Sequence, residues 1–185
     1  MINKNKYLPC FYYDSVFDIS YNFFLKKNIK VLCFDLDNTL LSSKENKLNP
    51  NILNLLKKLS EDFKIFIISN TSLKKLQNIV QCHNLSFIYL NLYHKKPSIW
   101  GFKKLLQLVK CSPNQIMMIG DQLRTDIASA NKINIISVLV KPLDRQNESF
   151  FTKLSRYWIE KPFIQKIKKN NLEEYKKKFQ NFIKQ

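Results

Sequence analysis

The stretch VLCFDLDNTLLSS (residues 31–43) begins as an apolar run and ends in two aspartates, Asp35 and Asp37, with one leucine between them. A short apolar run bounded by polar residues is typical of a buried strand. An Asp-x-Asp pair alone is weak evidence for a site, because turns and helix caps use aspartate constantly. The meaning of the pair therefore depends on where this strand lies in the fold.

Length and composition predict a single domain with a sizeable core. The chain has 185 residues, of which 45% are hydrophobic, and no apolar run approaches the ~20 residues that a membrane-spanning helix needs. The first residues, MINKNKYLPCFYYDS, lack the apolar core of a secretory signal. We expect a cytoplasmic protein. A peripheral place at the inner face of a membrane and an organellar matrix are both compatible with this expectation.

The formal net charge of +17 is large for this length. Such a charge predicts attraction to an anionic partner. Lysine dominates over arginine, and asparagine and isoleucine are also abundant, so an AT-rich genome would produce the same bias without any selection for binding. The sequence leaves both explanations open.

Hydrophobic periodicity predicts an alternation of strands and helices. Nearly continuous apolar strands separated by helices are typical of a parallel sheet that is covered on both faces, so the predicted fold class is a doubly wound α/β domain. The predicted strands are residues 30–36, 63–69, 86–90, 115–120 and 134–140, and the predicted helices are 50–62, 72–83, 97–110 and 123–132. The predicted organisation is an N-terminal segment packing on the core (1–28), the core (29–148) and a basic helical C-terminal extension (149–185).

Polar residues follow several of these strands at the point where each strand ends. In an open parallel sheet, ligands bind beyond the carboxyl ends of the strands near the point where the strand order reverses. The residues that could share this edge are Asp35, Asp37, Ser69, Asn70, Lys96, Gly120 and Asp121.

The order of the motifs DLDNT, ISN, KKP and GDQLRTD is more specific than any one of them. The set resembles the haloacid dehalogenase (HAD) superfamily of phosphatases. More closely, it resembles the YqeG family of subclass IIIA, which is related to mitochondrial phosphatidylglycerophosphate phosphatase. The resemblance runs from LPCFYYDSVFDI to KPLDRQNESFFTKLSR and is weak only over about the last two dozen residues.

The resemblance implies separate roles for the two carboxylates. Asp35 would be the nucleophile that forms an aspartyl-phosphate, and Asp37 would protonate the leaving oxygen and later take a proton from water. Asp35 must then be ionised while Asp37 carries a proton, so we expect environments that drive their pKa values apart. Thr39 would buttress the loop and hydrogen-bond the aspartate pair.

The resemblance also implies a magnesium site. Asp35, Asp121 and the backbone carbonyl of Asp37 would hold Mg²⁺, which prefers oxygen ligands. Asp126 would lie behind these ligands and orient either the lysine or a water on the metal.

Phosphate binding falls to a third group of residues. Lys96, directly before Pro97, would neutralise charge on the phosphate and the nucleophile, and the Ser69 hydroxyl and Asn70 backbone N–H would hold phosphate oxygens. Taken singly, each residue has an ordinary explanation: a loop hydroxyl for Thr39, a helix cap for Ser69, a solvated lysine for Lys96. As an ordered set, the catalytic interpretation is favoured.

The spacing of the motifs excludes a separate cap domain. Asp37 and Ser69 are separated by 31 residues, and Asn70 and Lys96 by 25, which is enough for a loop, a helix and a short strand only. A site without a cap is open and suits a phosphate carried on something large, such as a lipid headgroup, a protein or a nucleic acid.

The C-terminal extension contains an amphipathic pattern. Phe150, Phe151, Leu154, Tyr157 and Trp158 recur at helical spacing among basic residues. We expect this stripe to pack on the core, and we expect Pro162 to break or restart the helix. Residues 163–185 either pack, stay solvated or are partly disordered. If the charge is functional, they are the candidate for docking on an anionic membrane.

The predicted function is that of a Mg²⁺-dependent phosphomonoester hydrolase working through an aspartyl-phosphate, with phosphatidylglycerophosphate as the first candidate substrate. One alternative is a phosphatase for a soluble or protein-borne phosphate. The other is a protein with the HAD fold that binds RNA or a ribosomal particle through its charge, although no RNA-binding motif with paired aromatics is visible. The oligomeric state and the substrate are left open.

Overall fold

The structure is a computed structural model that describes residues 5–81 and 83–184. Residues 1–4, Cys82 and Gln185, which fall in the predicted N-terminal segment, the second predicted helix and the C-terminal extension, lie outside the described residues.

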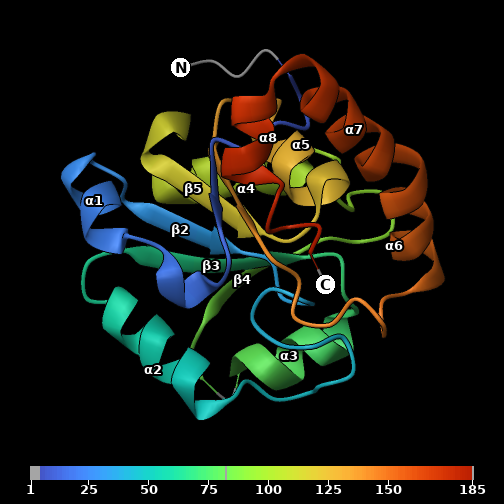
Figure 1. Cartoon of the computed structure of the whole chain (residues 1–185). Helices are drawn as coiled ribbons and strands as arrows, with labels where there is room; N and C mark the ends of the chain where they lie inside the picture. Colours follow the sequence, from blue (N-terminus) through green and yellow to red (C-terminus); the bar gives the residue numbers. More distant parts are fainter. Residues whose placement is uncertain (1–4, 82, 185) are drawn as a thin grey trace.

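A parallel sheet of six strands forms the centre of the molecule (Figure 1). The strand order is β1-β6-β5-β2-β3-β4, and every neighbouring pair is parallel. The predicted α/β class with a parallel sheet is therefore confirmed. The strands are β1 (Phe11–Tyr13), β2 (Val31–Phe34), β3 (Lys64–Ser69), β4 (Ser86–Tyr89), β5 (Ile116–Gly120) and β6 (Ile136–Val140).

The strand carrying the aspartates lies in the middle of the sheet. All four residues of β2 are buried, and Phe34 is in register with Ile67 of β3 on one side and Ile119 of β5 on the other. The chain continues from β2 to β3 in one direction and adds β5 and β6 in the other, so the strand order reverses beside β2. This reversal is where open parallel sheets bind ligands.

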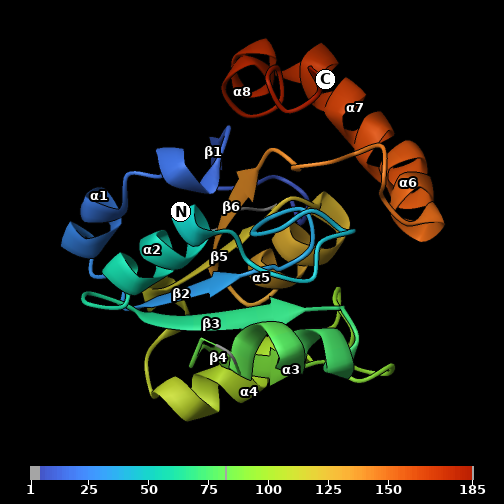
Figure 2. The same cartoon turned by 90° about the horizontal axis from the view of Figure 1, so that it is seen from below.

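Helices cover both faces of the sheet (Figures 1 and 2). One face packs against α1, α2 and α3, and the other against α4 and α5. Their bounds are α1 (Tyr21–Lys26), α2 (Pro50–Leu59), α3 (Leu73–Gln81), α4 (Trp100–Val109) and α5 (Ala128–Asn131), with a π-helical turn, η3 (Leu123–Ile127), directly before α5 and short 3-10 turns at Val16–Asp18 and Pro113–Gln115.

Local sequence explains the clearest of these helices. In α2, the Asn49 side chain accepts a hydrogen bond from the Ile52 N–H at 2.9 Å, and Pro50 occupies the first turn, where its missing N–H costs nothing. Ile52, Leu56 and Leu59 then recur on one face and are buried against the sheet.

The N-terminal segment adds an edge strand that the sequence did not predict. Phe11–Tyr13 pairs with β6 in parallel, from Phe11 opposite Val138 to Tyr13 opposite Val140. Ser137 supports this edge, because its backbone carbonyl accepts a hydrogen bond from the Cys10 N–H at 2.9 Å.

The C-terminal extension forms a third layer of helices above the β1–β6 edge of the sheet (Figure 2). It consists of α6 (Phe150–Ser155), a π-helical turn, η4 (Arg156–Glu160), α7 (Lys161–Asn170) and α8 (Leu172–Lys178). Pro162 was predicted to break or restart the helix, and a new helix does begin here: Pro162 lies in the first turn of α7, directly after the π-helical turn.

The prediction for the apolar stripe of this extension is wrong. Its members Phe150, Phe151, Leu154, Tyr157 and Trp158 are exposed and do not pack on the core. The segment that packs is the later one: Ile164, Tyr175, Phe179 and Phe182 are buried in a cluster with Leu123, Ile127 and Leu139. A helical stripe has the same period whether it meets a core or faces outward, so the sequence pattern could not distinguish the two.

Within the two described ranges, none of the helices is long and apolar enough to cross a membrane.

Candidate active site

The carboxyl ends of β2, β3 and β5 bring most of the predicted site residues together. Asp35 directly follows β2, Ser69 ends β3, and Asp121 directly follows β5. Lys96 reaches the same edge from the loop between β4 and α4, and Asp126 from η3. The residues are distant in sequence but line one cavity, of about 740 Å³, together with Asp37 and Asn70.

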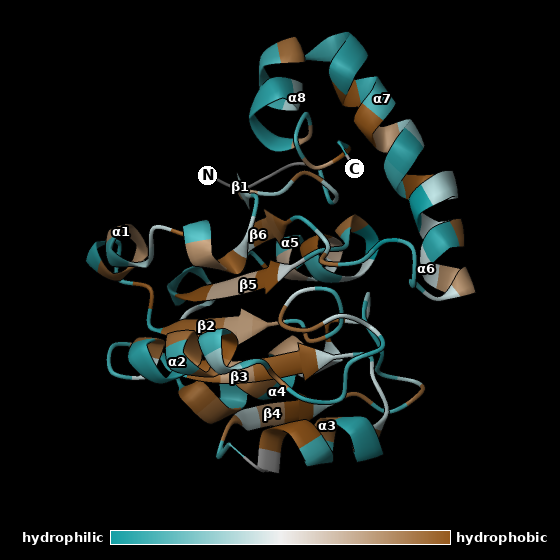
Figure 3. Ribbon diagram, turned by 60° about the horizontal axis from the view of Figure 1, so that its bottom comes forward, coloured by the Kyte–Doolittle hydropathy of each residue, from teal (hydrophilic) through white to brown (hydrophobic). Residues whose placement is uncertain are grey.

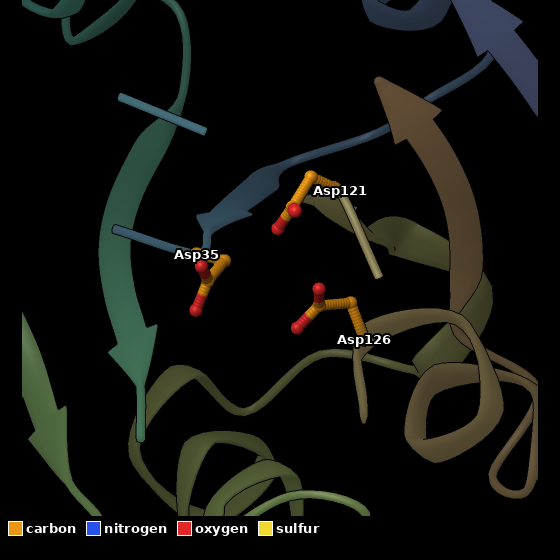
Figure 4. A group of neighbouring side chains, drawn as sticks. All are labelled: Asp35, Asp121 and Asp126. Carbon is orange, nitrogen blue, oxygen red and sulfur yellow. The ribbon is translucent and has the colours of Figure 1, made fainter. Parts of the chain in front are cut away.

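Three aspartates face one another in the floor of this cavity (Figure 4). Asp35, Asp121 and Asp126 each offer a carboxylate oxygen, and these three oxygens lie within 4.8 Å of one another. All three residues are buried. Asp126 was predicted to orient the lysine or a metal-bound water; its Oδ1 accepts a hydrogen bond from the Lys96 ammonium, and its carboxylate also lies among the oxygens that could hold a metal ion.

Lys96 is the cation at the centre of this group. Its ammonium donates to Asp35 Oδ1 at 2.6 Å, to Asp126 Oδ1 at 2.6 Å and to the Ile68 carbonyl at 2.7 Å. Burial alone would lower the pKa of Lys96, but the charges of Asp126 and Asp35 outweigh it and raise the pKa above its usual value. Lys96 is therefore a permanent positive charge beside Asp35.

Asn70 holds the backbone on both sides of Lys96. Its side-chain oxygen accepts from the Lys96 N–H at 2.7 Å, and its side-chain nitrogen donates to the Lys96 carbonyl at 3.0 Å. Ser69 is buried beside it, and the Ser69 hydroxyl accepts a weak bond from the Thr71 N–H at 3.4 Å. The sequence predicted a role for the Asn70 backbone but not this side-chain clamp.

Asp37 has a different environment from Asp35. The Asp37 side chain is 32% exposed, against 10% for Asp35. The ammonium of Lys75, on α3, lies 2.7 Å from Asp37 Oδ1 and also donates to the Ser43 carbonyl at 3.1 Å. Lys75 was not predicted as a site residue, because it looked like one of many solvated lysines.

Thr39 departs from its predicted contact. The residue is buried, but among the described residues its hydroxyl has no hydrogen-bond partner, so it does not bond either aspartate. Its backbone N–H instead closes the turn by donating to the Leu36 carbonyl at 3.3 Å.

The pKa of Asp35 also differs from the expectation. Burial raises the pKa of this carboxyl to about 7, although the charge of Lys96 opposes the shift. Burial likewise raises the pKa of Asp121 well above its usual value, against the opposing charge of Arg156. An ionised Asp35 therefore calls for further positive charge near these carboxylates.

Gly120 allows Asp126 to approach the end of β5. A Cβ atom at this position would lie 2.5 Å from both Cγ and Oδ2 of Asp126. The Asp126 carboxylate is also fixed by the Gln122 N–H, which donates to Oδ2 at 3.0 Å. A side chain at position 120 would thus displace the aspartate that orients Lys96.

We expect Gly120→Ala to reduce phosphatase turnover by about 100-fold, since displacing a catalytic constellation by about 1 Å has this order of effect. The matched control is Gly101→Ala, in α4, whose Cβ would come closest to the end of the flexible Leu90 side chain, at 2.6 Å, and would touch Ile68 at an ordinary 3.6 Å. Steady-state kinetics and thermal melting of both variants test this. Equal kcat losses in the two variants would contradict a specific effect on Asp126.

Arg156 is a further site residue that the sequence analysis missed. Its guanidinium donates to the carboxylate and, at 3.1 Å, to the backbone carbonyl of Asp121. It also contacts Glu148, with Nε 2.8 Å from each carboxylate oxygen, and Glu160 at 2.9 Å. The C-terminal extension thus reaches the floor of the cavity.

The two glutamates connect Arg156 to the loops that carry the aspartates. Glu160 accepts from the Leu123 N–H at 2.7 Å, and Glu148 accepts from the Asn38 side chain at 3.5 Å. One sequence signal pointed to this network: arginine is rare in this lysine-rich chain and occurs only at Arg124, Arg145 and Arg156. The bidentate geometry of the guanidinium suits such buried carboxylates.

The profile of the family described as "Mitochondrial PGP phosphatase" matches residues 1–142. The chain belongs to this family. It is also 25% identical, over 167 residues, to the Bacillus subtilis (strain 168) protein described as "Probable phosphatase YqeG", a match that covers 90% of this chain and 94% of that protein.

Solved structures share the fold. A HAD family enzyme from Bacteroides thetaiotaomicron in complex with magnesium and inorganic phosphate superposes with a TM-score of 0.52 at 14% identity, over 64% of this chain and 98% of that one. A haloacid dehalogenase-like hydrolase from Xanthomonas campestris gives 0.51 at 10% identity, over 66% and 84%. The resemblance to HAD and YqeG phosphatases is confirmed, and the chain is a HAD-type phosphatase.

The cluster of aspartates fits a magnesium ion. Its donors are carboxylate oxygens, which this hard cation prefers. Among the described residues, five carboxylates (Asp35, Asp121, Asp126, Glu148 and Glu160) surround the two cations Lys96 and Arg156. A divalent cation would balance part of the excess negative charge and favour the ionised form of Asp35.

Proposed function

We propose that this phosphatase is a Mg²⁺-dependent phosphomonoester hydrolase that works through an aspartyl-phosphate on Asp35. The observation that carries the proposal is the buried contact of Asp35 with Lys96, at 2.6 Å, within the group of three facing aspartates. Asp35 and Asp121, with the backbone carbonyl of Asp37, would hold the metal, and the ion would offset negative charge between the phosphate and the nucleophile.

In the first step, a carboxylate oxygen of Asp35 attacks phosphorus, and the bond from phosphorus to the ester oxygen breaks. Asp37 supplies the proton that the leaving alkoxide needs. The greater exposure of Asp37, which lines the same cavity as Asp35, supports this role, because the leaving group must depart toward solvent. Lys96 stays charged and stabilises both the carboxylate and the entering phosphate.

In the second step, water attacks the phosphorus of the aspartyl-phosphate. Asp37 takes the proton from this water, inorganic phosphate leaves, and the Asp35 carboxylate is restored. Lys75, 2.7 Å from Asp37, keeps that carboxylate in position. Ser69 and the Asn70 backbone N–H are proposed to hold the phosphate oxygens, and the side-chain amide of Asn70 keeps Lys96 in place.

For the substrate, we infer phosphatidylglycerophosphate, hydrolysed by a peripheral enzyme at the inner face of a membrane. Three features support this substrate. They are the description of the matched family, the absence of a cap domain in the described part of the chain, and the basic surface. A lipid-borne phosphate is large and needs an open entrance of this kind.

A phosphate-release assay tests both the chemistry and the substrate. We expect the purified protein to hydrolyse phosphatidylglycerophosphate faster than a soluble phosphomonoester or a phosphopeptide, and to lose all turnover in EDTA and regain it with Mg²⁺. Turnover that survives EDTA would exclude the metal. A preference for the soluble ester or the phosphopeptide would reject the lipid substrate and keep the phosphatase.

A further inference from the structure

The outward face of α6 and η4 carries a continuous stripe of large apolar side chains. They recur at the i, i+1, i+4, i+7, i+8 spacing of one helical face, and their exposed fractions lie between 42% and 78%. We call this set the aromatic ridge: Phe150, Phe151, Leu154, Tyr157 and Trp158. Exposed apolar patches of this kind on a folded domain mark interaction surfaces.

The ridge is held outward by the opposite face of the same helix. Ser155, Arg156 and Glu160 are buried there, and Arg156 is bound to Asp121 and Glu148. Rotating the helix to bury the ridge would pull the charged side chains of Arg156 and Glu160 out of their network, at a high cost in free energy. The exposure of the ridge is therefore built into the fold.

The ridge stands at the rim of the active-site cavity. Phe151 and its neighbour Thr152 line that cavity together with the catalytic aspartates. In Figure 3, the arrowheads of β2, β3 and β5 point toward the side of the molecule where α6 lies. A surface that meets the ridge thus lies beside the entrance through which the substrate phosphate must pass.

Positive charge accompanies the ridge. Beside it is a second cavity, of about 550 Å³, lined by apolar side chains such as Ile164 and by more cations than carboxylates. The cations are Arg145, Lys153, Arg156, Lys161 and Lys168, and the two carboxylates, Glu148 and Glu160, both pair with Arg156. The Arg145 guanidinium donates to the Phe182 carbonyl at 2.7 Å, and its Nε is buried without a hydrogen-bond partner among the described residues. This side of the molecule therefore attracts an anionic surface and has room for its polar groups.

We propose that the aromatic ridge docks the enzyme on a bilayer that contains anionic phospholipid. This inference rests on the proposed function, for which it identifies the docking surface. Aromatic side chains flanked by lysines on an amphipathic helix suit the interface of a membrane, where rings reach the acyl boundary and ammonium groups meet phosphates. An exposed helical stripe of large apolar side chains with cations beside it matches a broad anionic surface better than a groove-binding peptide.

Vesicle sedimentation tests the proposal. We expect wild-type protein to bind vesicles of phosphatidylcholine with phosphatidylglycerol, to bind phosphatidylcholine alone weakly, and to dissociate as salt rises. Phe150→Ser/Trp158→Ser should lower the affinity by at least about tenfold, since each large side chain loses apolar burial. Phe23→Ser/Leu108→Ser, which removes two exposed apolar side chains from α1 and α4, should bind like wild type.

Several results would overturn the docking proposal. One is that wild-type protein does not bind the anionic vesicles, and another is that Phe150→Ser/Trp158→Ser binds them as tightly as wild type. A third is that wild-type protein is a dimer and this variant is a monomer, which would assign the ridge to contact with a second copy of the chain. The docking proposal would also be overturned if the wild-type protein bound RNA more tightly than vesicles and the same variant lost that RNA binding. If the double variant does not fold, Trp158→Ser takes its place.

A soluble phosphomonoester separates this proposal from the proposed function. If wild-type protein shows no Mg²⁺-dependent turnover of that ester, the catalytic scheme is rejected, whatever the vesicle result. Turnover of the ester together with a failure to bind vesicles would reject the docking surface alone.

Discussion

Asp35→Asn is expected to lower phosphate release by at least about 10⁴-fold, the order of loss seen when a covalent nucleophile is removed. Asparagine has nearly the same shape but cannot form an aspartyl-phosphate. The assay is Mg²⁺-dependent phosphate release at saturating substrate. Activity within tenfold of wild type would contradict the assignment of Asp35 as the nucleophile.

The stability of the same variant gives an independent signature. Burial raises the pKa of Asp35 to about 7, so the charged form is unfavourable in the folded protein without metal. Because the pKa of this carboxyl is higher in the folded protein than in the unfolded chain, its ionisation lowers the free energy of unfolding as the pH rises from the unfolded-chain pKa toward about 7. Asparagine does not ionise and therefore removes this effect. We therefore expect the metal-free melting temperature at neutral pH to be unchanged or higher. Asp62→Asn, at an exposed aspartate after α2, is the matched control for both measurements.

Arg156→Met is expected to lower the free energy of unfolding by about 3–5 kcal/mol, the usual cost of removing one partner from a buried ionic network. Asp121, Glu148 and Glu160 would then be buried without their common cation. Urea denaturation measures the loss. Added Mg²⁺ should restore part of the stability, and more than it adds to wild type, because a divalent cation can supply the missing charge.

Two further variants make this result specific. Arg156→Lys keeps the charge but loses the planar fork, so it should be less destabilised than the methionine variant. Arg124→Met removes an exposed arginine and should change the free energy of unfolding by no more than about 0.5 kcal/mol. A similar small change in Arg156→Met would show that the network adds little stability.

The central part of the fold was predictable because its signals are local. The strands that became β2, β3 and β5 are short apolar runs, and their polar ends place Asp35, Ser69 and Asp121 at one edge by the geometry of parallel strands. By contrast, β1 has only three partly buried residues and no alternation, so its pairing with β6 had no signal in the sequence.

The contacts of the site were less predictable because they join distant segments. Lys96 could be chosen from its motif, but Lys75 and Arg156 differ from other surface cations only in what the fold places beside them. The same limit explains the wrong prediction for the apolar stripe at residues 150–158. The pattern identified an apolar face on residues 150–158, and the fold decided that the later side chains, such as Phe179 and Phe182, pack inward.

The position of Arg156 in the chain has a consequence for biosynthesis. A ribosome makes Asp35, Lys96 and Asp121 well before it makes Arg156, whose guanidinium lies over the ring of the buried Phe182, in the turn after α8. The carboxylate-rich pocket thus acquires its arginine only after the chain has been translated through Phe182. The pocket is therefore completed later in synthesis than the sheet that carries its aspartates.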